Sequence, residues 1–391
     1  MGLMGAGSTA NNVLLLLAAL EKVLKAGGER RMALKPMLAA DALQNFVGAV
    51  ERAHLNAPWA REESALAPRP RVLPFLWRWA DIEPLLRQAG ELMTPGRGAE
   101  RRILQLTNPG VAGQSATHTL VTAVQLLLPG ECAPAHRHSP TAIRFIMQGQ
   151  GAYTTVEGEK CPMAPGDLVL TPAWTWHDHG SESAEPVIWM DGLDVPLIQS
   201  LDTSFYEAFP DDRQPINRAA DSTRRYGAGG LKPAWIKPHS SLPPLVRYPW
   251  EQTSAALQRL AEIDASPFDD VALEYTNLAT GGSALRTMAC WVQLLRPGVR
   301  TQAHRQTSSA VYHVFAGQGY SVIAGQRFDW RPGDFFAVPP WAWHEHANTA
   351  AEEAILFSIH DMPVFEALGL YREEAYGEHG GHQPVTSVFD G

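Results

Sequence analysis

Apolar and polar positions divide the chain into two parts with different periodicity. Between about residues 13 and 90, apolar side chains recur three and four positions apart, for example across residues 39–50, which predicts helices. From Arg101 onward, short segments of β-branched and aromatic residues end at turns that contain glycine, as at residues 119–130 and 152–158, which is typical of strands. We therefore expect a helical N-terminal region at residues 1–100, followed by a mainly β molecule.

The β part contains an internal repeat longer than fifty residues. The first copy comprises QLLLPG at 125–130, HRH at 136–138, GQG at 149–151, APGD at 164–167 and TPAWTWHDH at 171–179. The second comprises QLLRPG at 293–298, HRQ at 304–306, GQG at 317–319, RPGD at 331–334 and VPPWAWHEH at 338–346. The match predicts a duplicated β module, at residues 101–200 and 286–391, joined by a connecting segment rich in Pro, Ser and charge at residues 201–285.

Composition agrees with this organisation. A chain of 391 residues with 45% apolar content is long enough for two or three globular units. Its 30 prolines and 33 glycines suit short strands joined by turns better than a helical bundle. The formal charge of -9 opposes electrostatic attraction to nucleic acid or to anionic lipid, so neither is an expected partner.

Cysteine usage and the N-terminal apolar run bear on the location of the protein. The three cysteines, Cys132, Cys161 and Cys290, form no CxxC pair, which argues against a disulfide framework or a thiolate zinc site and favours a reducing cytoplasm. The apolar run from Val13 to Leu20 is far shorter than the roughly 20 residues that span a bilayer. We expect it to form an amphipathic helix rather than a membrane anchor.

Three histidines of the first copy have the spacing of a metal site. His136 and His138 alternate along a strand, so their side chains project to the same face. His177 follows about forty residues later, where an antiparallel return strand supplies a third imidazole. Three neutral nitrogens on one side of an ion leave the opposite positions open for other ligands.

These motifs carry a resemblance to a known superfamily. Gly130, His136-x-His138 and the later Pro-x-Trp-x-x-His177 pattern resemble the two signature motifs of the cupins, which are small double-stranded β-helix barrels. The chain departs from the usual motif because Ala142 and Ile143 stand where a carboxylate ligand is expected. The resemblance therefore implies a bicupin whose metal has only three protein ligands.

A closer resemblance covers roughly residues 75 to 380. The duplication, the missing carboxylate and the segments at 135–138, 142–145, 151–153 and 174–179 look like the gentisate 1,2-dioxygenase family, which includes salicylate and hydroxynaphthoate dioxygenases. Membership would imply a non-haem enzyme with one Fe(II) per subunit, which cleaves an aromatic ring between its carboxyl-bearing and hydroxyl-bearing carbons. It would also imply a homotetramer, with a small aromatic ortho-hydroxycarboxylate and dioxygen as the partners.

Such a substrate can chelate iron through its carboxylate and phenolate oxygens and leave one position for dioxygen. Its carboxylate needs a cation, and the planar fork of Arg144 suits it, with Ile143 and Phe145 facing the other way. Arg101 and Arg102 open the strand that leads into the first module, and alternation allows one of the two to face the same pocket.

Four further residues are candidates around the metal. His179 shares a strand face with His177, so we expect it to hydrogen-bond the substrate or to transfer a proton. Asp191 and Gln125 match family positions and are expected to orient the ligand imidazoles by accepting their distal N–H groups, and Gln125 also to contact the substrate. The family usually has an aromatic residue near Val121, and its absence here predicts a wider pocket.

The second copy has lost part of this set. His304 and His344 correspond to the first and third ligands, but Gln306 replaces the middle one. His313 lies one residue beyond the position of Arg144 and should face the opposite side of its strand. We expect a degenerate site there, in a barrel used for packing and oligomer contact.

Three hypotheses on function follow from these observations. The first is an Fe(II) ring-cleaving dioxygenase acting on gentisate or a related salicylate. The second is another metal-dependent enzyme on the same barrel, such as an isomerase or a decarboxylase using Mn, Zn or Ni. The third is a non-catalytic cupin that stores or senses a small ligand.

Overall fold

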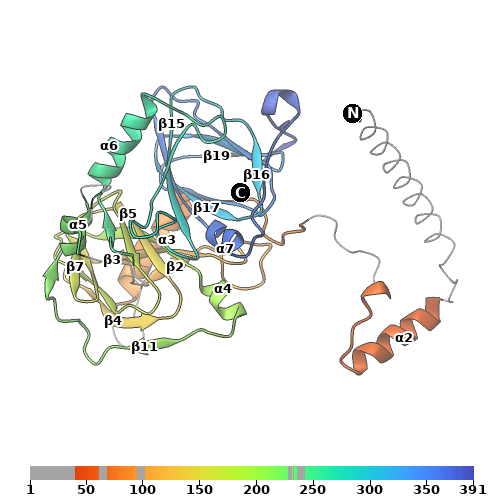
Figure 1. The fold of residues 1–391 in the computed structure, drawn as a ribbon, viewed down its shortest axis with the longest axis horizontal. Helices are drawn as coiled ribbons and strands as arrows, with labels where there is room; N and C mark the ends of the chain where they lie inside the picture. The colour runs from red at the N-terminus through yellow and green to blue at the C-terminus, as the bar shows by residue number, and fades with distance from the viewer. Residues whose placement is uncertain (1–39, 61–67, 95–101, 228–230, 232, 236–242) are drawn as a thin grey trace, which may run out of the picture. The chain divides into compact units, whose positions relative to one another are not determined.

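The computed structural model describes residues 40–60, 68–94, 102–227, 231, 233–235 and 243–391, which fall into two compact units, 1–67 and 68–391. The first unit contains helix α2 (Ala40–Arg52) and the short helix η1 (Pro58–Ala60), shown in Figure 1. The helix expected across residues 39–50 is thus confirmed, whereas the predicted helix around Val13 lies outside the described residues. Within the described part of the chain, no helix has both the length and the apolar character needed to cross a bilayer.

The larger unit consists of two barrels, and each is built from two six-stranded sheets. The sheets of barrel 1 have the orders β13-β8-β5-β10-β3-β2 and β11-β4-β9-β6-β7-β12. Their strands are β2 (Ile103–Gln105), β3 (Val121–Leu127), β4 (Cys132–His138), β5 (Ala142–Gln148), β6 (Ala152–Val156), β7 (Glu159–Met163), β8 (Leu168–Thr171), β9 (His177–Ser181), β10 (Val187–Leu193), β11 (Tyr206–Ala208), β12 (Arg218–Ala219) and β13 (Arg247–Tyr248).

Barrel 2 repeats this topology, with the sheet orders β1-β20-β17-β22-β15-β14 and β23-β16-β21-β18-β19-β24. Its strands are β1 (Phe75–Trp77), β14 (Val271–Glu274), β15 (Ala289–Leu295), β16 (His304–Gln306), β17 (Ala310–Ala316), β18 (Gly319–Ile323), β19 (Gln326–Trp330), β20 (Phe335–Val338), β21 (His344–Ala347), β22 (Ala354–His360), β23 (Glu373–Ala375) and β24 (Ser387–Val388). The helices of the larger unit are α3 (Trp79–Leu92), α4 (Val195–Ser200), α5 (Asp221–Tyr226), α6 (Trp250–Ala261), α7 (Met362–Ala367) and the 3-10 turn η2 (His379–Gly381). The mainly β architecture and the duplication expected from the repeat are confirmed.

The two barrels exchange one strand each. Strand β1 precedes barrel 1 in the chain but pairs with β20 of barrel 2, and β13 precedes barrel 2 but pairs with β8 of barrel 1. The helix after each exchanged strand is anchored on the same barrel that the strand joins. The amide N–H of Trp79 donates to Asp334 of barrel 2 (2.7 Å), and that of Trp250 donates to Asp167 of barrel 1 (2.8 Å). Residues 68–94 therefore belong to the barrel unit.

Alternation along the strands separates the barrel interiors from the contact between the barrels. On β5, Ile146 packs inside barrel 1 with Trp189, whereas Phe145 belongs to a core shared by both barrels. The Phe145 ring stacks on Phe357 of barrel 2 at 4.1 Å. Each barrel thus has its own interior, and a common apolar layer fixes the position of one barrel against the other.

Candidate metal centre

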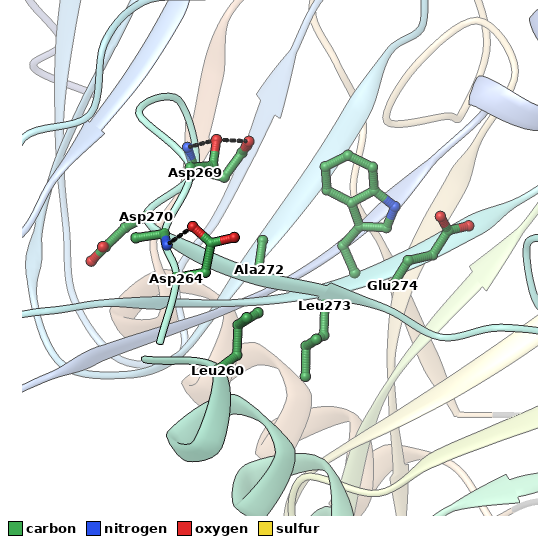
Figure 2. Close-up of a pocket in the computed structure, with 10 residues that line it drawn as sticks. Leu260, Asp264, Asp269, Asp270, Ala272, Leu273 and Glu274 are labelled. Carbon is green, nitrogen blue, oxygen red and sulfur yellow. Dashed lines mark hydrogen bonds between the residues drawn. The ribbon is translucent and has the colours of Figure 1, made fainter. Parts of the chain in front are cut away.

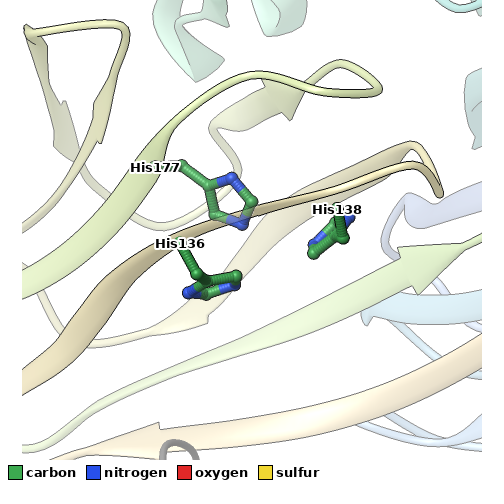
Figure 3. Close-up of side chains that lie close together, drawn as sticks. All are labelled: His136, His138 and His177. Atoms are coloured by element: carbon green, nitrogen blue, oxygen red, sulfur yellow. The ribbon is translucent and has the colours of Figure 1, made fainter. Parts of the chain in front are cut away.

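His136, His138 and His177 converge inside barrel 1, as Figure 3 shows. Strand β4 carries the first two, and β9 pairs with it so that His177 lies opposite His136 in register. Their ligand atoms lie within 4.8 Å of one another, and the three side chains are 1%, 8% and 1% exposed. The structure therefore brings together the three residues whose spacing predicted a metal site.

Backbone carbonyls orient all three imidazoles. The Nδ1 atoms of His136, His138 and His177 lie 2.7, 2.7 and 2.9 Å from carbonyl oxygens, which belong to Pro134, Pro140 and Thr175 respectively. Because a carbonyl only accepts hydrogen bonds, each Nδ1 must carry a proton, and in the neutral ring each Nε2 then holds the lone pair that binds a metal. This assigns one tautomer to every ring before an ion arrives.

That arrangement corrects the role expected of Asp191 and Gln125, which do not accept the distal N–H groups of the ligands. The acceptors are main-chain oxygens two residues from each histidine, and a main-chain oxygen has no signature in the sequence. The donor set fits a divalent first-row transition metal, since the three imidazoles are oriented by carbonyl hydrogen bonds and almost fully buried. Among the residues that the structure describes, it is the one cluster of His, Cys, Asp or Glu with such spacing.

Asp191 instead pairs with Arg144. The two residues face each other across β5 and β10, and Nε of Arg144 lies 3.4 Å from Oδ1 of Asp191. The guanidinium also donates to Oγ1 of Thr171 (3.0 Å), and Asp191 accepts a hydrogen bond from the indole of Trp189 (3.1 Å). Arg144 is fully buried, on the strand face opposite to Phe145, so this cation is held inside the barrel that contains the histidines.

His179 is buried beside the triad. Its ring centroid lies 5.9 Å from that of His177 and 5.7 Å from that of Trp189. The Nδ1 atom is 2.9 Å from the hydroxyl of Thr154 on the neighbouring strand β6. A hydroxyl partner on one ring nitrogen fixes the plane of the imidazole, as a residue that exchanges protons with a substrate requires.

Strand β3 contributes a row of buried side chains to the same interior. Val121, Ala123 and Gln125 alternate along one strand face and are 7%, 1% and 0% exposed. Within the described part of the chain, neither polar atom of the Gln125 amide has a hydrogen-bond partner. A buried amide in this state is a site that the polar group of a ligand or a water molecule would complete.

The two arginines before the first barrel differ in what can be said of them. Arg101 lies outside the described residues. Arg102 is 1% exposed, and its guanidinium forms an ion pair with Glu131 (2.9 Å) while donating to the carbonyls of Leu126 and Met93. These contacts commit Arg102 to the barrel wall rather than to a substrate.

Tyr206 is a neighbour of the metal ligands that the sequence did not reveal. It lies on β11, which pairs with β4, and its ring stacks on that of His136 at 5.3 Å and 21°. The residue falls in the segment expected to be a connection, some seventy positions after its histidine, outside every motif. Only the pairing of two distant strands places it there.

Barrel 2 is filled where barrel 1 holds its site residues. Trp291 and Tyr312 occupy the strand positions that correspond to Ala123 and Arg144, and the indole of Trp291 lies 4.7 Å from the ring of His360. Gln306, at the position of the middle ligand, accepts from the hydroxyl of Tyr371 (3.2 Å). Aromatic side chains thus take up the space that a substrate would need.

Four histidines of barrel 2, His313, His344, His346 and His360, are buried, and burial favours their neutral form. Burial lowers the pKa of His346 and of His360 to about 3, and it lowers the pKa of His344 well below its usual value. His313 faces outward between Phe335 and Phe145, at ring distances of 4.6 and 6.0 Å. The expectation that His313 lies on the face opposite to the ligand positions is confirmed.

An acidic cavity of about 380 Å³ borders barrel 2, and Figure 2 shows its lining. Asp270 is paired with Arg296 at 2.5 Å, and Asp269 accepts from the hydroxyl of Ser266 at 3.0 Å. Glu274 lies on the same wall without a neighbouring cation among the contacts of the described residues. Carboxylates repel an anionic ligand, so this cavity does not suit an aromatic carboxylate.

Comparison with known proteins matches both halves of the molecule. Residues 123–195 and 291–360 each match the family model of the cupin domain, and these ranges coincide with the two copies of the repeat. The bicupin fold expected from the motifs is thereby confirmed.

Full-length relatives share most of the chain. The protein is 44% identical to a 5-aminosalicylate 1,2-dioxygenase from a Comamonas species, over 90% of this chain and 97% of that protein. It is 40% identical to a gentisate 1,2-dioxygenase from a Streptomyces species, over 84% and 94% of the two chains. The crystal structure of salicylate 1,2-dioxygenase from Pseudoaminobacter salicylatoxidans with gentisate has a TM-score of 0.81 at 32% identity, and covers 88% of this chain and 97% of that one.

Proposed function

The chain belongs to the bicupin family of ring-cleaving gentisate and salicylate 1,2-dioxygenases, and from this premise we propose its metal and its substrate class. We propose one ferrous ion per subunit, bound by His136, His138 and His177. The observation that supports it is the triad itself, buried and with each Nδ1 proton held by a carbonyl. When bound, the ion supplies open positions at which a substrate and dioxygen meet, together with the path for electrons between them.

The substrate that these residues suit is a benzoate with a hydroxyl group ortho to its carboxylate. The proteins named above act on 5-aminosalicylate, gentisate and salicylate, and each of these carries that pair of groups. Arg144, held by Asp191 and Thr171, binds the carboxylate and sets the orientation of the ring. The Gln125 amide binds a second polar group of the substrate, because burial leaves it no other partner among the described residues.

His179 moves the proton of the ring hydroxyl. Thr154 holds its ring by Nδ1, so that Nε2 is the atom that takes the proton when the hydroxyl becomes a phenolate. Small side chains on β3, Val121 and Ala123, make room for a substituent on the ring, which favours gentisate or another 5-substituted salicylate. The buried walls around these residues exclude bulk water from the reacting ring.

The decisive experiment is a substrate panel with the metal-loaded protein. The protein is reconstituted with Fe(II) without oxygen, and gentisate, salicylate, 5-aminosalicylate and 1-hydroxy-2-naphthoate are added before air. We expect one molecule of dioxygen to be consumed per molecule of substrate, and a new absorbance band from the ring-opened product. If none of these compounds caused oxygen uptake, the proposal would be rejected, and release of carbon dioxide without uptake would identify a decarboxylase.

Two properties of the whole protein are part of the same proposal. We infer a homotetramer, which light scattering after size-exclusion chromatography measures directly. We also infer a cytoplasmic enzyme, because Cys132, Cys161 and Cys290 are all free thiols and a reducing compartment keeps them so. Burial raises the pKa of Cys161 to about 12, so this thiol is a packing group rather than a nucleophile.

A further inference from the structure

Asp194 joins the two barrels beside the candidate metal centre. It follows strand β10, is 1% exposed, and accepts two hydrogen bonds with its carboxylate. The amide N–H of Thr141, in barrel 1, donates to Oδ1 at 2.7 Å. The hydroxyl of Thr287, just before the first long strand of barrel 2, donates to Oδ2 at 2.6 Å. One buried carboxylate is thus shared between a residue of each barrel.

Thr141 belongs to the loop that orients His138. The carbonyl of Pro140, the preceding residue, accepts from Nδ1 of His138 at 2.7 Å. Asp194 also returns a backbone contact, because its own N–H lies 3.4 Å from the Thr141 carbonyl. The carboxylate therefore holds the loop on which the tautomer and the direction of His138 depend.

Thr141 also contacts the loop that leads to the third ligand. Its hydroxyl accepts from the N–H of Ala173 at 3.2 Å. Two residues later, Thr175 accepts from Nδ1 of His177 at 2.9 Å through its carbonyl. Both ligand loops are consequently tied to one threonine, which is itself tied to Asp194.

A cavity of about 280 Å³ separates these loops from barrel 2. It is lined by Ser139 and Thr141 of the first ligand loop, by Pro172 and Ala173 of the second, and by residues 283–287 of barrel 2. Side-chain packing is incomplete at this junction, so apolar contact alone does not fix the ligand loops against barrel 2. The hydrogen bond from Thr287 to Asp194 crosses the junction directly.

The same network occurs a second time with the barrels exchanged. Asp361 accepts from the N–H of Ser309 (2.7 Å) in barrel 2 and from the hydroxyl of Thr119 in barrel 1. In this copy, however, the loop follows Gln306, which is not a histidine. The duplication therefore provides a pair of equivalent bonds, one beside the metal centre and one away from it.

We propose that Thr287 of barrel 2 is a positioning residue for the metal centre of barrel 1. Its hydroxyl fixes Asp194, Asp194 fixes the Pro140–Thr141 loop, and that loop fixes His138. The inference rests on the proposed function only for the location of the metal. Outer partners of ligand histidines typically change metal affinity about 10- to 100-fold, and we expect the lower end here because Thr287 acts through intermediate links.

The test compares Thr287→Val with Thr119→Val, two nearly isosteric changes that remove the equivalent hydroxyl groups. Co(II) is the probe, its affinity is measured by competition with a chelator, and its visible spectrum reports ligand geometry. We expect Thr287→Val to weaken Co(II) binding about tenfold and to alter the spectrum. Thr119→Val should leave both unchanged, and Thr287→Ser, which keeps the hydroxyl, should bind like the parent protein.

Equal losses in the two valine variants, or none in Thr287→Val, would overturn the proposal, as would a parent protein that binds no Co(II). Thermal unfolding of the metal-free variants checks that each is folded, and Thr287→Ser distinguishes a lost hydrogen bond from a disturbed core. Affinity and oxygen uptake are separate readouts. A parent protein that binds the metal but cleaves no ring would reject the proposed function while the role of Thr287 is still decided by affinity.

Discussion

The individual residues of the triad are prepared for a metal by the backbone around them. Each histidine donates a hydrogen bond from Nδ1 to the main-chain carbonyl of a residue two positions away. The orientation of each ring is therefore set by the local backbone. A metal then meets three lone pairs whose directions need little reorganisation. This local design explains why short motifs were enough to predict the ligands.

The first prediction separates the two histidine sets. His138→Ala removes one of three protein ligands, so we expect the iron content of the purified protein to fall to near zero. His304→Ala changes the corresponding barrel, where Gln306 is bonded to Tyr371, and should leave about one iron per subunit. Metal analysis of both variants, loaded under the same conditions, makes the comparison, and an equal loss in both would place a metal in barrel 2.

The second prediction concerns the cation inside barrel 1. Arg144→Lys keeps the charge but loses the planar fork that Asp191 and Thr171 orient. We expect KM for the ring carboxylate to rise about tenfold to a hundredfold, the equivalent of roughly 1.5–3 kcal/mol for a charged hydrogen bond. Iron content should not change. Steady-state oxygen uptake measures KM, and an unchanged value would show that Arg144 does not bind the substrate.

Residue-scale prediction from the sequence reached its limit where contacts come from backbone or from distant strands. The ligands His136 and His138 follow from alternation, and Arg144 follows from the same rule in the next strand. The acceptors for the imidazole protons are main-chain atoms, which any residue type provides. The stacking of Tyr206 on His136 depends on strand pairing between segments seventy residues apart, and no local pattern encodes it.

At the scale of strands, one substitution distinguishes the open barrel from the filled one. Ala123 on β3 and Trp291 on β15 occupy corresponding positions, each pairing with the corresponding strand of its own sheet. Barrel 1 has a small buried side chain at this position, and barrel 2 has an indole whose ring lies 4.7 Å from that of His360. The same fold therefore either leaves room for a ligand or has an interior filled by side chains, according to the size of a few residues that face the barrel interior.

The third prediction tests this exchange. Ala123→Trp should fill the pocket of barrel 1, so that ring cleavage falls at least a hundredfold while iron is retained, because the ligands lie on the opposite sheet. Trp291→Ala serves as the control in the filled barrel. It should cost about 3–5 kcal/mol of stability through the cavity it opens and leave turnover unchanged. Full activity in Ala123→Trp would mean that the substrate does not occupy this space.

The strands themselves were predictable, but their sheet partners were not. Alternation and turn residues located the segments from Thr119 onward, and the repeat predicted two equivalent modules. Nothing in the periodicity of β1 or β13 indicates that each joins the barrel farther from it in the chain. Both strands are only two or three residues long, too short to carry a pattern.

At the scale of the whole molecule, buried histidines of barrel 2 couple folding to pH. The pKa of His313, His346 and His360 is lowered to about 3 by burial, whereas the unfolded chain has histidines near 6.5. Between these values the unfolded chain binds more protons than the folded one, so the free energy of unfolding decreases as the pH falls below about 6.5. The histidines of barrel 2 thus make the metal-free protein sensitive to mild acid.

The fourth prediction follows from that sign. The urea concentration at the unfolding midpoint of the metal-free protein should decrease as the pH is lowered from 7 to 5. His313→Phe, placed between Phe145 and Phe335, should reduce the slope by about one proton, or about 1.4 kcal/mol per pH unit. The slope is obtained from unfolding curves at several pH values. An identical slope in parent and variant would show that His313 is protonated in the folded protein.

Two arms, β1 with the start of α3 and β13 with the start of α6, make the two barrels one folding unit. Each arm packs a tryptophan against a glycine of the barrel that its strand joins. A Cβ at Gly333 would lie 2.4 Å from Cγ of Trp79, and one at Gly166 would lie 2.5 Å from Cγ of Trp250. Both glycines have positive φ, +92° and +85°. These turns were recognised in the sequence as Pro-Gly-Asp, yet the arm that each one receives could not be inferred, because the contact joins segments more than eighty residues apart.

The fifth prediction measures what this docking contributes. Gly333→Ala carries both a conformational cost and a collision with Trp79, whereas Gly298→Ala, at a similar φ of +75° and with nothing within 4 Å of the new Cβ, carries the conformational cost alone. We expect Gly333→Ala to lower stability by about 1–3 kcal/mol more than Gly298→Ala, the usual cost of overpacking. Because the arm that shifts also carries β1 of barrel 2 and leads into barrel 1, unfolding followed by fluorescence and by iron loss should shift together in Gly333→Ala. Iron retained after barrel 2 has unfolded would mean that barrel 1 remains folded without barrel 2.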